Sequence, residues 1–175
     1  MPQRSGPAFT PAPGDLEFEY LVRRHQAMVY SIAFHFLQDG SAAEELAQDV
    51  FLQLHRHLSK LTSREHVIYW LRRVAVHRCI DHRRRQRPSL LSLDQVPEPR
   101  AEARTYDPWL ARRLHALIGS LAPKARLVVI LRYQEDLTPG EIAGVMRLPT
   151  VKSLLRRSLA LLRDKIGRAV GGVRT

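Results

Sequence analysis

The sequence predicts an all-α protein made of two small helical domains joined by a linker. Apolar residues recur at helical spacing through most of the chain, many of these stretches begin at a capping residue, and none alternates with period two as a strand does. The segment PSLLSLDQVPEPRAEARTYD contains prolines and mixed charge without a sustained period. We therefore expect a disordered tail at residues 1–14, a first domain at 15–87, a linker at 88–107 and a second domain at 108–175.

The first domain opens with two predicted helices. The first spans residues 15–37 and ends at Asp39-Gly40. Ser41 and Glu44 have the spacing of a capping box, so the second helix is expected to start there. The stripe that this helix should bury consists of Leu46, Val50, Phe51, Leu54 and Leu58.

Three acidic residues, Glu44, Glu45 and Asp49, gather in the first turns of this second helix. Acids near a helix N-terminus stabilise it through the helix dipole, by about a few tenths of a kcal/mol each. In a basic chain they could equally form a docking face for a basic partner. Composition does not choose between these two explanations.

A third helix is predicted over residues 67–85, after a polar loop at 61–66. Basic residues lie mostly on one arc of this helix, which Val76 and Ile80 interrupt. They are Arg72, Arg73, His77, Arg83 and Arg84. Simple solvation and phosphate binding explain these residues equally well at this stage.

The second domain should contain four helices. Pro108 and Pro123 each start one, and Thr138 with Glu141 forms a capping box that places Pro139 at the first helical position of the third. The packing of the first two behind the last two would complete a small helical domain. The closing residues 167–175 are expected to fray.

The last two helices have the pattern of a helix-turn-helix. After a break at residues 147–149, Thr150 is a candidate N-cap for a helix with one apolar and one basic side. The polar side carries Lys152, Ser153, Arg156, Arg157 and Arg163. A short capped helix, a tight turn and a longer basic helix are what a helix-turn-helix needs in a DNA major groove. The alternative is an αα-hairpin whose arginines are only solvated.

Composition favours a polyanionic partner. The 175 residues carry 28 Lys and Arg against 17 Asp and Glu, a net charge of +11, which suits nucleic acid or an anionic membrane surface. No apolar run approaches the about 18 residues of a membrane-spanning helix, and the first residues lack the apolar block of a signal peptide. We expect a soluble, cytoplasmic protein. The single cysteine, Cys79, excludes an internal disulfide.

The sequence contains no catalytic pattern. A Gly-rich phosphate loop, a G-x-S-x-G elbow and an H-E-x-x-H motif are all missing. His77, Cys79 and His82 are ligand-type residues, but the first two are two apart on a helix, roughly 200° around its axis, and cannot share a metal. We therefore expect no enzyme activity, no cofactor and no bound metal.

Three segments carry a family resemblance. In chain order they are AEELAQDVFLQLHRHL, YWLRRVAVHRCIDHRRR and LAPKARLVVILRYQEDLTPGEIAGVMRLPTVKSLLRRSLALLR. Together they resemble the sigma-70 family of bacterial RNA polymerase sigma factors, in its extracytoplasmic-function class, over roughly residues 15–167. The resemblance implies a region 2-like and a region 4-like domain. It also implies core RNA polymerase (β′ clamp helices and β flap) and promoter DNA as partners, and leaves room for an anti-sigma factor.

The resemblance implies a polymerase-docking role for the second helix. The residues that match the segment docking on the β′ clamp helices are Glu44, Glu45, Leu46, Gln48, Asp49 and Phe51. Such a role would explain why acids gather on one helix of a basic protein.

The resemblance also implies two DNA-binding roles. The loop 61–66 and the helix 69–84 match segments that capture the non-template strand of the minus-ten element, where stacking of an unstacked base is worth ~1–3 kcal/mol. Phosphate contacts would come from Arg72, Arg73, Arg83 and Arg84, and His77 stands where the family often has Asn. The minus-thirty-five element would be recognised by Lys152, Ser153 and Arg156, with Arg157 and Arg163 on phosphates.

The turn before the recognition helix departs from the family pattern. Pro149 abuts Thr150 where the family usually places a few more residues, and Arg147 stands where a turn glycine is common. Leu154 also replaces a commonly basic residue. Since the amphipathic phase of the helix survives, we expect the domain to fold and the helix to meet the groove at an altered angle.

The predicted function is a non-enzymatic transcription initiation factor that binds core RNA polymerase and directs promoter-specific initiation. One alternative is a stand-alone helix-turn-helix regulator, which would bind duplex DNA tightly without polymerase. Another is a degenerate sigma-like subunit that binds polymerase without recognising the upstream element. Unchanged promoter choice after Lys152→Ala and Arg156→Ala would favour the degenerate subunit.

Overall fold

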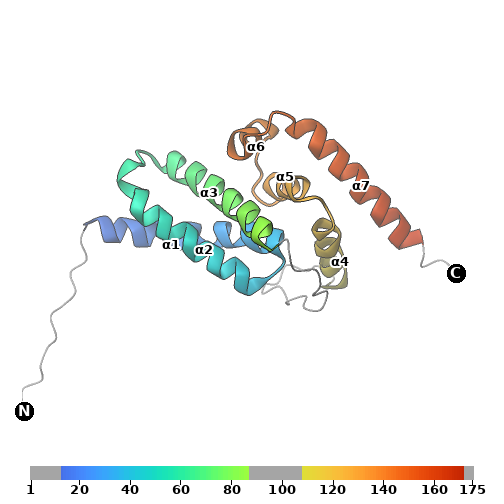
Figure 1. Ribbon diagram of the computed structural model, residues 1–175, viewed down its shortest axis with the longest axis horizontal. Helices are drawn as coiled ribbons and strands as arrows, with labels where there is room; N and C mark the ends of the chain where they lie inside the picture. Colours follow the sequence, from blue (N-terminus) through green and yellow to red (C-terminus); the bar gives the residue numbers. More distant parts are fainter. Residues whose placement is uncertain (1–12, 87–107, 172–175) are drawn as a thin grey trace, which may run out of the picture.

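The computed structural model describes residues 13–86 and 108–171, and all regular structure in these ranges is helical (Figure 1). The elements are α1 (Pro13–Leu37), α2 (Gly40–His57), the 3-10 turn η1 (Leu58–Lys60), α3 (Arg64–Arg85), α4 (Pro108–Gly119), α5 (Pro123–Tyr133), α6 (Pro139–Met146) and α7 (Val151–Gly171). The all-α prediction is confirmed. The predicted tail up to residue 12, the predicted linker at 88–107 and residues 172–175 lie outside the described residues.

All three helices of the first half begin earlier than the sequence predicts, and α1 starts at Pro13, inside the predicted tail. α2 starts at Gly40, because the Asp39 carboxylate accepts a hydrogen bond from the backbone N–H of Ala42 at 3.1 Å. The predicted start at a Ser41 capping box is therefore wrong. α3 starts at Arg64, because Ser63 Oγ accepts from the backbone N–H three residues later. The predicted loop before α3 is correspondingly shorter.

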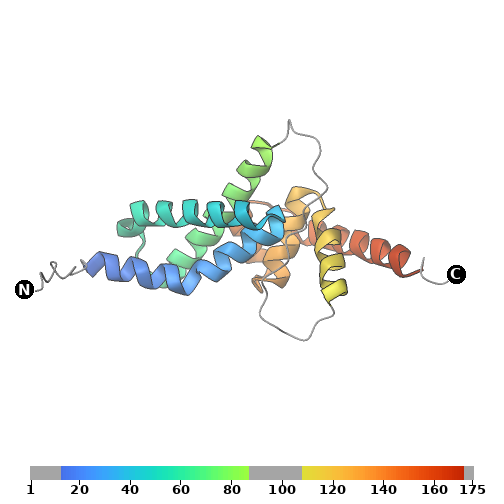
Figure 2. The ribbon, with the colours of Figure 1, turned by 90° about the horizontal axis from the view of Figure 1, so that it is seen from below.

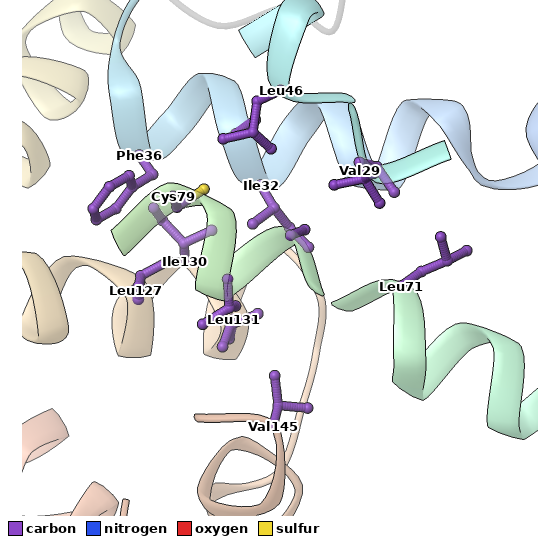
Figure 3. Close-up of a cluster of buried hydrophobic side chains, with 14 of the residues drawn as sticks. Val29, Ile32, Phe36, Leu46, Leu71, Cys79, Leu127, Ile130, Leu131 and Val145 are labelled. Atoms are coloured by element: carbon purple, nitrogen blue, oxygen red, sulfur yellow. The ribbon is translucent and has the colours of Figure 1, made fainter. Parts of the chain in front are cut away.

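The chain forms two groups of helices that pack side by side, α1–α3 and α4–α7 (Figure 2). One continuous hydrophobic core joins them. Figure 3 shows Ile32 and Phe36 of α1 beside Leu127 and Leu131 of α5, with Val145 of α6 in the same cluster. Each is almost completely buried, and burying such a side chain contributes about 1.5–3 kcal/mol. The core thus fixes the two groups against each other.

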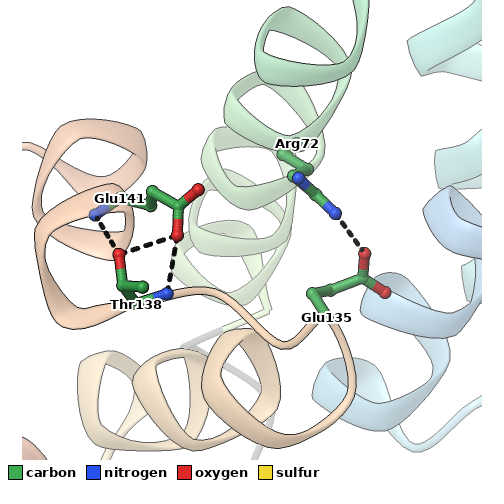
Figure 4. A network of polar contacts seen from close by, with 4 residues as sticks. All are labelled: Arg72, Glu135, Thr138 and Glu141. Atoms are coloured by element: carbon green, nitrogen blue, oxygen red, sulfur yellow. Dashed lines mark hydrogen bonds and ion pairs between the residues drawn. The ribbon is translucent and has the colours of Figure 1, made fainter. Parts of the chain in front are cut away.

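Polar contacts cross the same boundary on the side of α3. Arg72 of α3 donates to Glu135, in the loop after α5, at 3.3 Å, and the Glu135 side chain is only 8% exposed (Figure 4). The hydroxyl of Tyr69 donates to the carbonyl of Gly144 in α6 at 3.0 Å. These contacts place α6 and the preceding loop over one flank of α3.

The predicted helix-turn-helix forms from α6 and α7. Thr138 and Glu141 make the full capping box, with the carboxylate accepting from the Thr138 N–H at 2.7 Å (Figure 4). α6 ends at Arg147, whose φ of 52° is the left-handed conformation that a glycine adopts most easily. α7 follows at Val151, which is buried, so the shortened turn still brings the second helix onto the core. The expectation that this unit folds is confirmed.

Candidate functional site

An open pocket of about 540 Å³ lies between α2 and α3. Its walls combine aromatic rings, basic groups and amides with a single carboxylate. They are Gln53 of α2 and His66, Tyr69, Trp70, Arg73, Val74, His77, Arg78 and Asp81 of α3. Such a mixture suits a flat heteroaromatic ring with a phosphate beside it, which is the chemistry of an unstacked nucleotide.

Local contacts hold the pocket walls in place. The Trp70 ring lies 5.6 Å from the His57 ring, which α2 supplies, and His57 Nδ1 lies 2.9 Å from the carbonyl of Gln53. With its amide oxygen turned toward α3, Gln53 accepts from Arg78 Nε at 2.7 Å. The pocket is therefore a junction of two packed helices rather than a feature of α3 alone.

The basic residues predicted on α3 separate into three places. Arg73 and His77 line the pocket, and Arg83 and Arg84 are exposed in the last turn of the helix. Arg72 instead turns toward the second half of the chain and pairs with a carboxylate there, because adjacent residues point about 100° apart on a helix. In this arrangement the Arg72 guanidinium pairs with a carboxylate of the same chain and does not face the pocket.

The structure also brings residues into the pocket that were not among the predicted DNA contacts. Gln53 comes from another helix, and spacing within one helix cannot reveal such a neighbour. Arg78 and Asp81 share the pocket face with His77, at positions one and four residues further on. Helical spacing alone places both on the side of Trp70 and Val74, where three-residue spacing predicts an ion pair rather than a ligand site.

On α2 the predicted docking residues divide by burial. Glu44, Glu45, Gln48 and Asp49 are exposed. Leu46 and Phe51 are only 5% and 8% exposed, so they pack in the core and position α2 rather than offering contact surface. Leu52 is the exposed apolar residue of this face, at 58%. Leu52 was not among the predicted docking residues, although it lies on the same side of the helix as Gln48 and Asp49.

On α7 three of the five predicted DNA-recognition residues line one groove. A groove of about 300 Å³ is lined by Pro139, Lys152, Leu155, Arg156, Leu159 and Arg163. Arg157 is exposed beside it and donates from Nε to the carbonyl of Ser153 at 3.4 Å. Ser153 itself is half-buried, and its hydroxyl donates to the carbonyl of Thr150. Three basic side chains thus line a single groove beside the capped end of α6.

The other reactive groups of the described chain do not form a site. Cys79 is buried in the core, and burial raises the pKa of its thiol to about 12. Within residues 13–86 and 108–171, no three His, Cys, Asp or Glu side chains gather as a metal site would require. No helix in these ranges is both long and apolar enough to cross a membrane.

Comparison with known proteins matches each half of the chain to a region of one protein family. Residues 21–89 match the family description of Sigma-70 region 2, and residues 111–162 match that of Sigma-70, region 4. The ECF RNA polymerase sigma factor SigE of Mycolicibacterium smegmatis is 30% identical over 177 residues, which cover 94% of this chain and 68% of that protein. The RNA polymerase sigma-E factor of Streptomyces avermitilis is 28% identical over 153 residues, which cover 86% of each chain.

Solved structures show the same fold. The sigma factor RpoE in complex with the anti-sigma factor NepR from Bartonella quintana matches with a TM-score of 0.66 at 16% identity, over 85% of this chain and 95% of that one. CnrH in complex with the cytosolic domain of CnrY matches with a TM-score of 0.65 at 19% identity. With both regions present in order and a relative that the chain matches along most of its length, the protein belongs to the sigma-70 family of RNA polymerase sigma factors, in the extracytoplasmic-function class.

Proposed function

We propose that this sigma factor binds core RNA polymerase through α2, opens the minus-ten element with α3 and recognises the minus-thirty-five element with α7. One observation carries the proposal: a single chain holds an open mixed pocket in its region 2 half and an exposed basic helix face in its region 4 half. These two surfaces match the two halves of a bipartite promoter.

The exposed part of α2 is the proposed polymerase-docking face. Glu45, Gln48, Asp49 and Leu52 recur at intervals of three or four residues, so they share one side of the helix. An apolar side chain ringed by acids suits a basic partner helix, because charge steers the encounter and the leucine supplies buried area. We propose that this face of α2 binds the β′ clamp helices of core polymerase. In the same proposal, the β flap contacts the second half of the chain.

In the region 2 half, the pocket between α2 and α3 is the proposed site of strand capture. Trp70 offers a ring for stacking, and stacking is worth ~1–3 kcal/mol per base. Arg73 and His77 stand at the same opening, where a backbone phosphate would follow the base. Arg83 and Arg84 continue the positive charge along the helix for the next phosphates. Holding one base out of the duplex in this way favours the open promoter.

In the region 4 half, Lys152 and Arg156 are the proposed base-recognition residues. Both are exposed and line the α7 groove, and an arginine or lysine there can donate to the two acceptors of a guanine edge. Ser153 is the third member of the proposed reading set. Arg157 and Arg163 are the proposed phosphate contacts on the same helix.

The same proposal covers partners and location. We assign the phosphodiester chemistry to the polymerase, so the chain itself is not an enzyme, and we place it in the cytoplasm, where polymerase and DNA are found. The solved RpoE structure was determined with an anti-sigma factor, which supports a protein of that class as a regulator of this chain.

Run-off transcription with purified bacterial core polymerase and a library of randomised promoters tests the proposal. Discrete start sites that share an upstream and a downstream motif are the expected result. Arg73→Ala with His77→Ala should then weaken the downstream motif, whereas Arg168→Ala, an exposed arginine near the end of α7, should leave both motifs unchanged. Tight, selective binding to duplex promoter DNA without polymerase would instead identify a stand-alone regulator.

A second candidate function rests on the shortened turn. Only residues 147–150 separate α6 from α7, and Arg147 takes up the left-handed conformation there. If this turn aims α7 away from the groove, the chain would be a polymerase-binding subunit that no longer recognises the upstream element. Polymerase binding with start sites that lack any upstream motif is the result that favours this candidate.

A further inference from the structure

Basic side chains meet where the end of α1 contacts α4 and α5. We call this contact the histidine seam, and it consists of His35 of α1, His115 of α4 and Arg126 of α5. The two imidazole rings lie 5.8 Å apart with their planes at 69°, and Phe34 stacks on His115 at 5.3 Å. Gln38 Nε2 donates to the backbone carbonyl of His115 at 2.5 Å. Because α1 belongs to one half of the chain and α4 and α5 to the other, the seam exists only when the halves are packed together.

Arg126 fixes one positive charge inside the seam. Its guanidinium donates to the carbonyl of Phe36 at 2.5 Å and also to the carbonyl of Gly119, and the residue is only 6% exposed. Burial, with a smaller effect of Arg83, lowers the pKa of Arg126 to about 10, so the group stays protonated at neutral pH. A proton added to either imidazole would bring a second charge beside it.

Within residues 13–86 and 108–171, the charges that act on the two rings are basic and do not neutralise an added proton. Among the described residues, His115 is the charged group that acts on His35, and Arg126 is the one that acts on His115; both are basic. From α3, Arg83 acts on Arg126. Asp39, the cap of α2, accepts a hydrogen bond from the N–H of Ala42.

Hydrogen bonding also favours the neutral rings. Nε2 of His115 is buried and has no hydrogen-bond partner among the described residues. Protonation at that atom would create a charged N–H with no acceptor, which is costly in a buried position. The closed arrangement therefore suits an uncharged imidazole at both positions.

The sign of the resulting pH dependence follows from proton counting. Burial, and to a lesser degree His115, lowers the pKa of His35 to about 4, and burial with Arg126 lowers the pKa of His115. Once exposed, an imidazole returns to an ordinary pKa of about 6.5. The closed form thus binds fewer protons than the open form. Its stability is complete above about pH 6.5 and is lost as the pH falls toward about 4.

We propose that the histidine seam is a proton-sensitive latch, in which protonation of His35 and His115 separates α1 from α4 and α5 and opens the two halves of the chain. Opening also parts Arg72 from Glu135 and Tyr69 from Gly144, which uncovers the flank of α3 that the second half covers. The latch acts in the free protein, so it goes beyond the proposed promoter function and does not depend on it.

Cys79 is a built-in reporter of opening. It is the chain's single cysteine and is fully buried, beside Phe36 of α1 and Leu127 and Ile130 of α5 (Figure 3). We would measure its reaction with a disulfide reagent that works in mild acid, divided by the rate for the urea-unfolded chain at the same pH. That division removes the effect of pH on the thiol itself. When closing is fast, the normalised rate equals the open-to-closed ratio.

The expected result is a normalised rate that rises at least about tenfold between about pH 7.5 and about pH 5.5, while helicity stays constant. His35→Gln with His115→Gln should remove this rise. His55→Gln, at an exposed histidine on α2, should keep it. An unchanged wild-type rate would overturn the latch, as would an equal rise in the double variant or a rise accompanied by loss of helicity.

A second measurement covers the case in which the double variant does not fold. Titration of the imidazole ring protons of the wild-type protein by NMR gives the pKa of each histidine directly. pKa values for His35 and His115 below the ordinary histidine value of about 6.5 are expected. Ordinary values at both seam positions would overturn the proposal without any variant.

Discussion

Arg72 and Glu135 are 63 positions apart in the chain, yet they form an ion pair of 3.3 Å across the two halves of the molecule. Arg72 is one of the cations assigned to promoter DNA, and Glu135 occupies it. Burial raises the pKa of Glu135 even though the neighbouring guanidinium acts in the opposite direction. Keeping the Glu135 carboxylate ionised in this buried position therefore costs free energy. The ion pair is a contact between domains and not a solvated surface salt bridge.

Glu135→Gln should weaken the closed arrangement. The substitution leaves the mostly buried Arg72 without its acid, and the loss of such a partner costs about 1–3 kcal/mol. Urea unfolding and the reactivity of the Cys79 thiol would measure the effect. Glu19→Gln is the matched control, because Glu19 pairs with Arg23 on the exposed face of α1 and should leave stability nearly unchanged. Equal stability of the two variants would show that the interdomain pair contributes nothing.

Asp49→Lys should weaken binding to core polymerase and leave the fold intact. Asp49 is exposed on α2, so the reversal of its charge alters the proposed docking face without touching the core. The measurements are affinity for purified core polymerase and helicity by circular dichroism. Glu17→Lys makes the same charge change at an exposed site on α1 and should bind normally. Loss of helicity in the Asp49 variant would refute the docking assignment.

Arg156→Ala should cost ~1–3 kcal/mol in promoter discrimination if this residue makes a two-pronged contact to a guanine. Affinity of the holoenzyme for promoters that differ at single upstream positions would reveal the loss at one base pair. Arg168→Ala removes an arginine that pairs with Asp164 further along α7, and it should not change the preference. A uniform loss across all upstream sequences would make Arg156 a phosphate contact.

Thr138→Ala should destabilise the second half by about 1 kcal/mol, because α6 loses its N-cap. Hydrogen bonds from the Thr138 side chain and backbone also hold the pKa of Glu141 below its ordinary value. That stabilisation is present above about pH 4.5 and lost as the pH falls further. Thermal unfolding near neutral pH would detect the substitution, and an unchanged melting temperature would contradict the assigned role of the cap. Thr62→Ala, at an exposed position in the loop before α3, removes a threonine hydroxyl outside the second half and is the control.

The helix-turn-helix could be predicted from sequence because its determinants are local. The hydroxyl of Thr138 and the carboxylate of Glu141 are three residues apart, and Pro139 fixes the first turn between them. The polar face of α7 follows from helical spacing in the same way. Its predicted cations are exposed in the structure as expected.

Features that depend on contacts between helices could not be predicted. Gln53 lines the α3 pocket from α2. Arg72 pairs with Glu135, which is 63 positions away, and spacing along the sequence does not indicate a contact between residues so far apart. The start of α2 was missed for a different reason. Asp39 and Ser41 are both residues that often cap helices, and the structure uses Asp39. Gln38 before it adopts the left-handed conformation, with a φ of 61°, and residue types alone do not predict that backbone conformation.

The shared core makes the two halves interdependent during folding. Since Ile32 and Phe36 are covered by Leu127 and Leu131, neither half has a complete apolar interior of its own. A fragment released by cleavage between the two halves would expose apolar side chains to water and would tend to self-associate. At neutral pH the intact free chain should instead melt in one cooperative transition, and any state in which the halves part exposes this shared core to water.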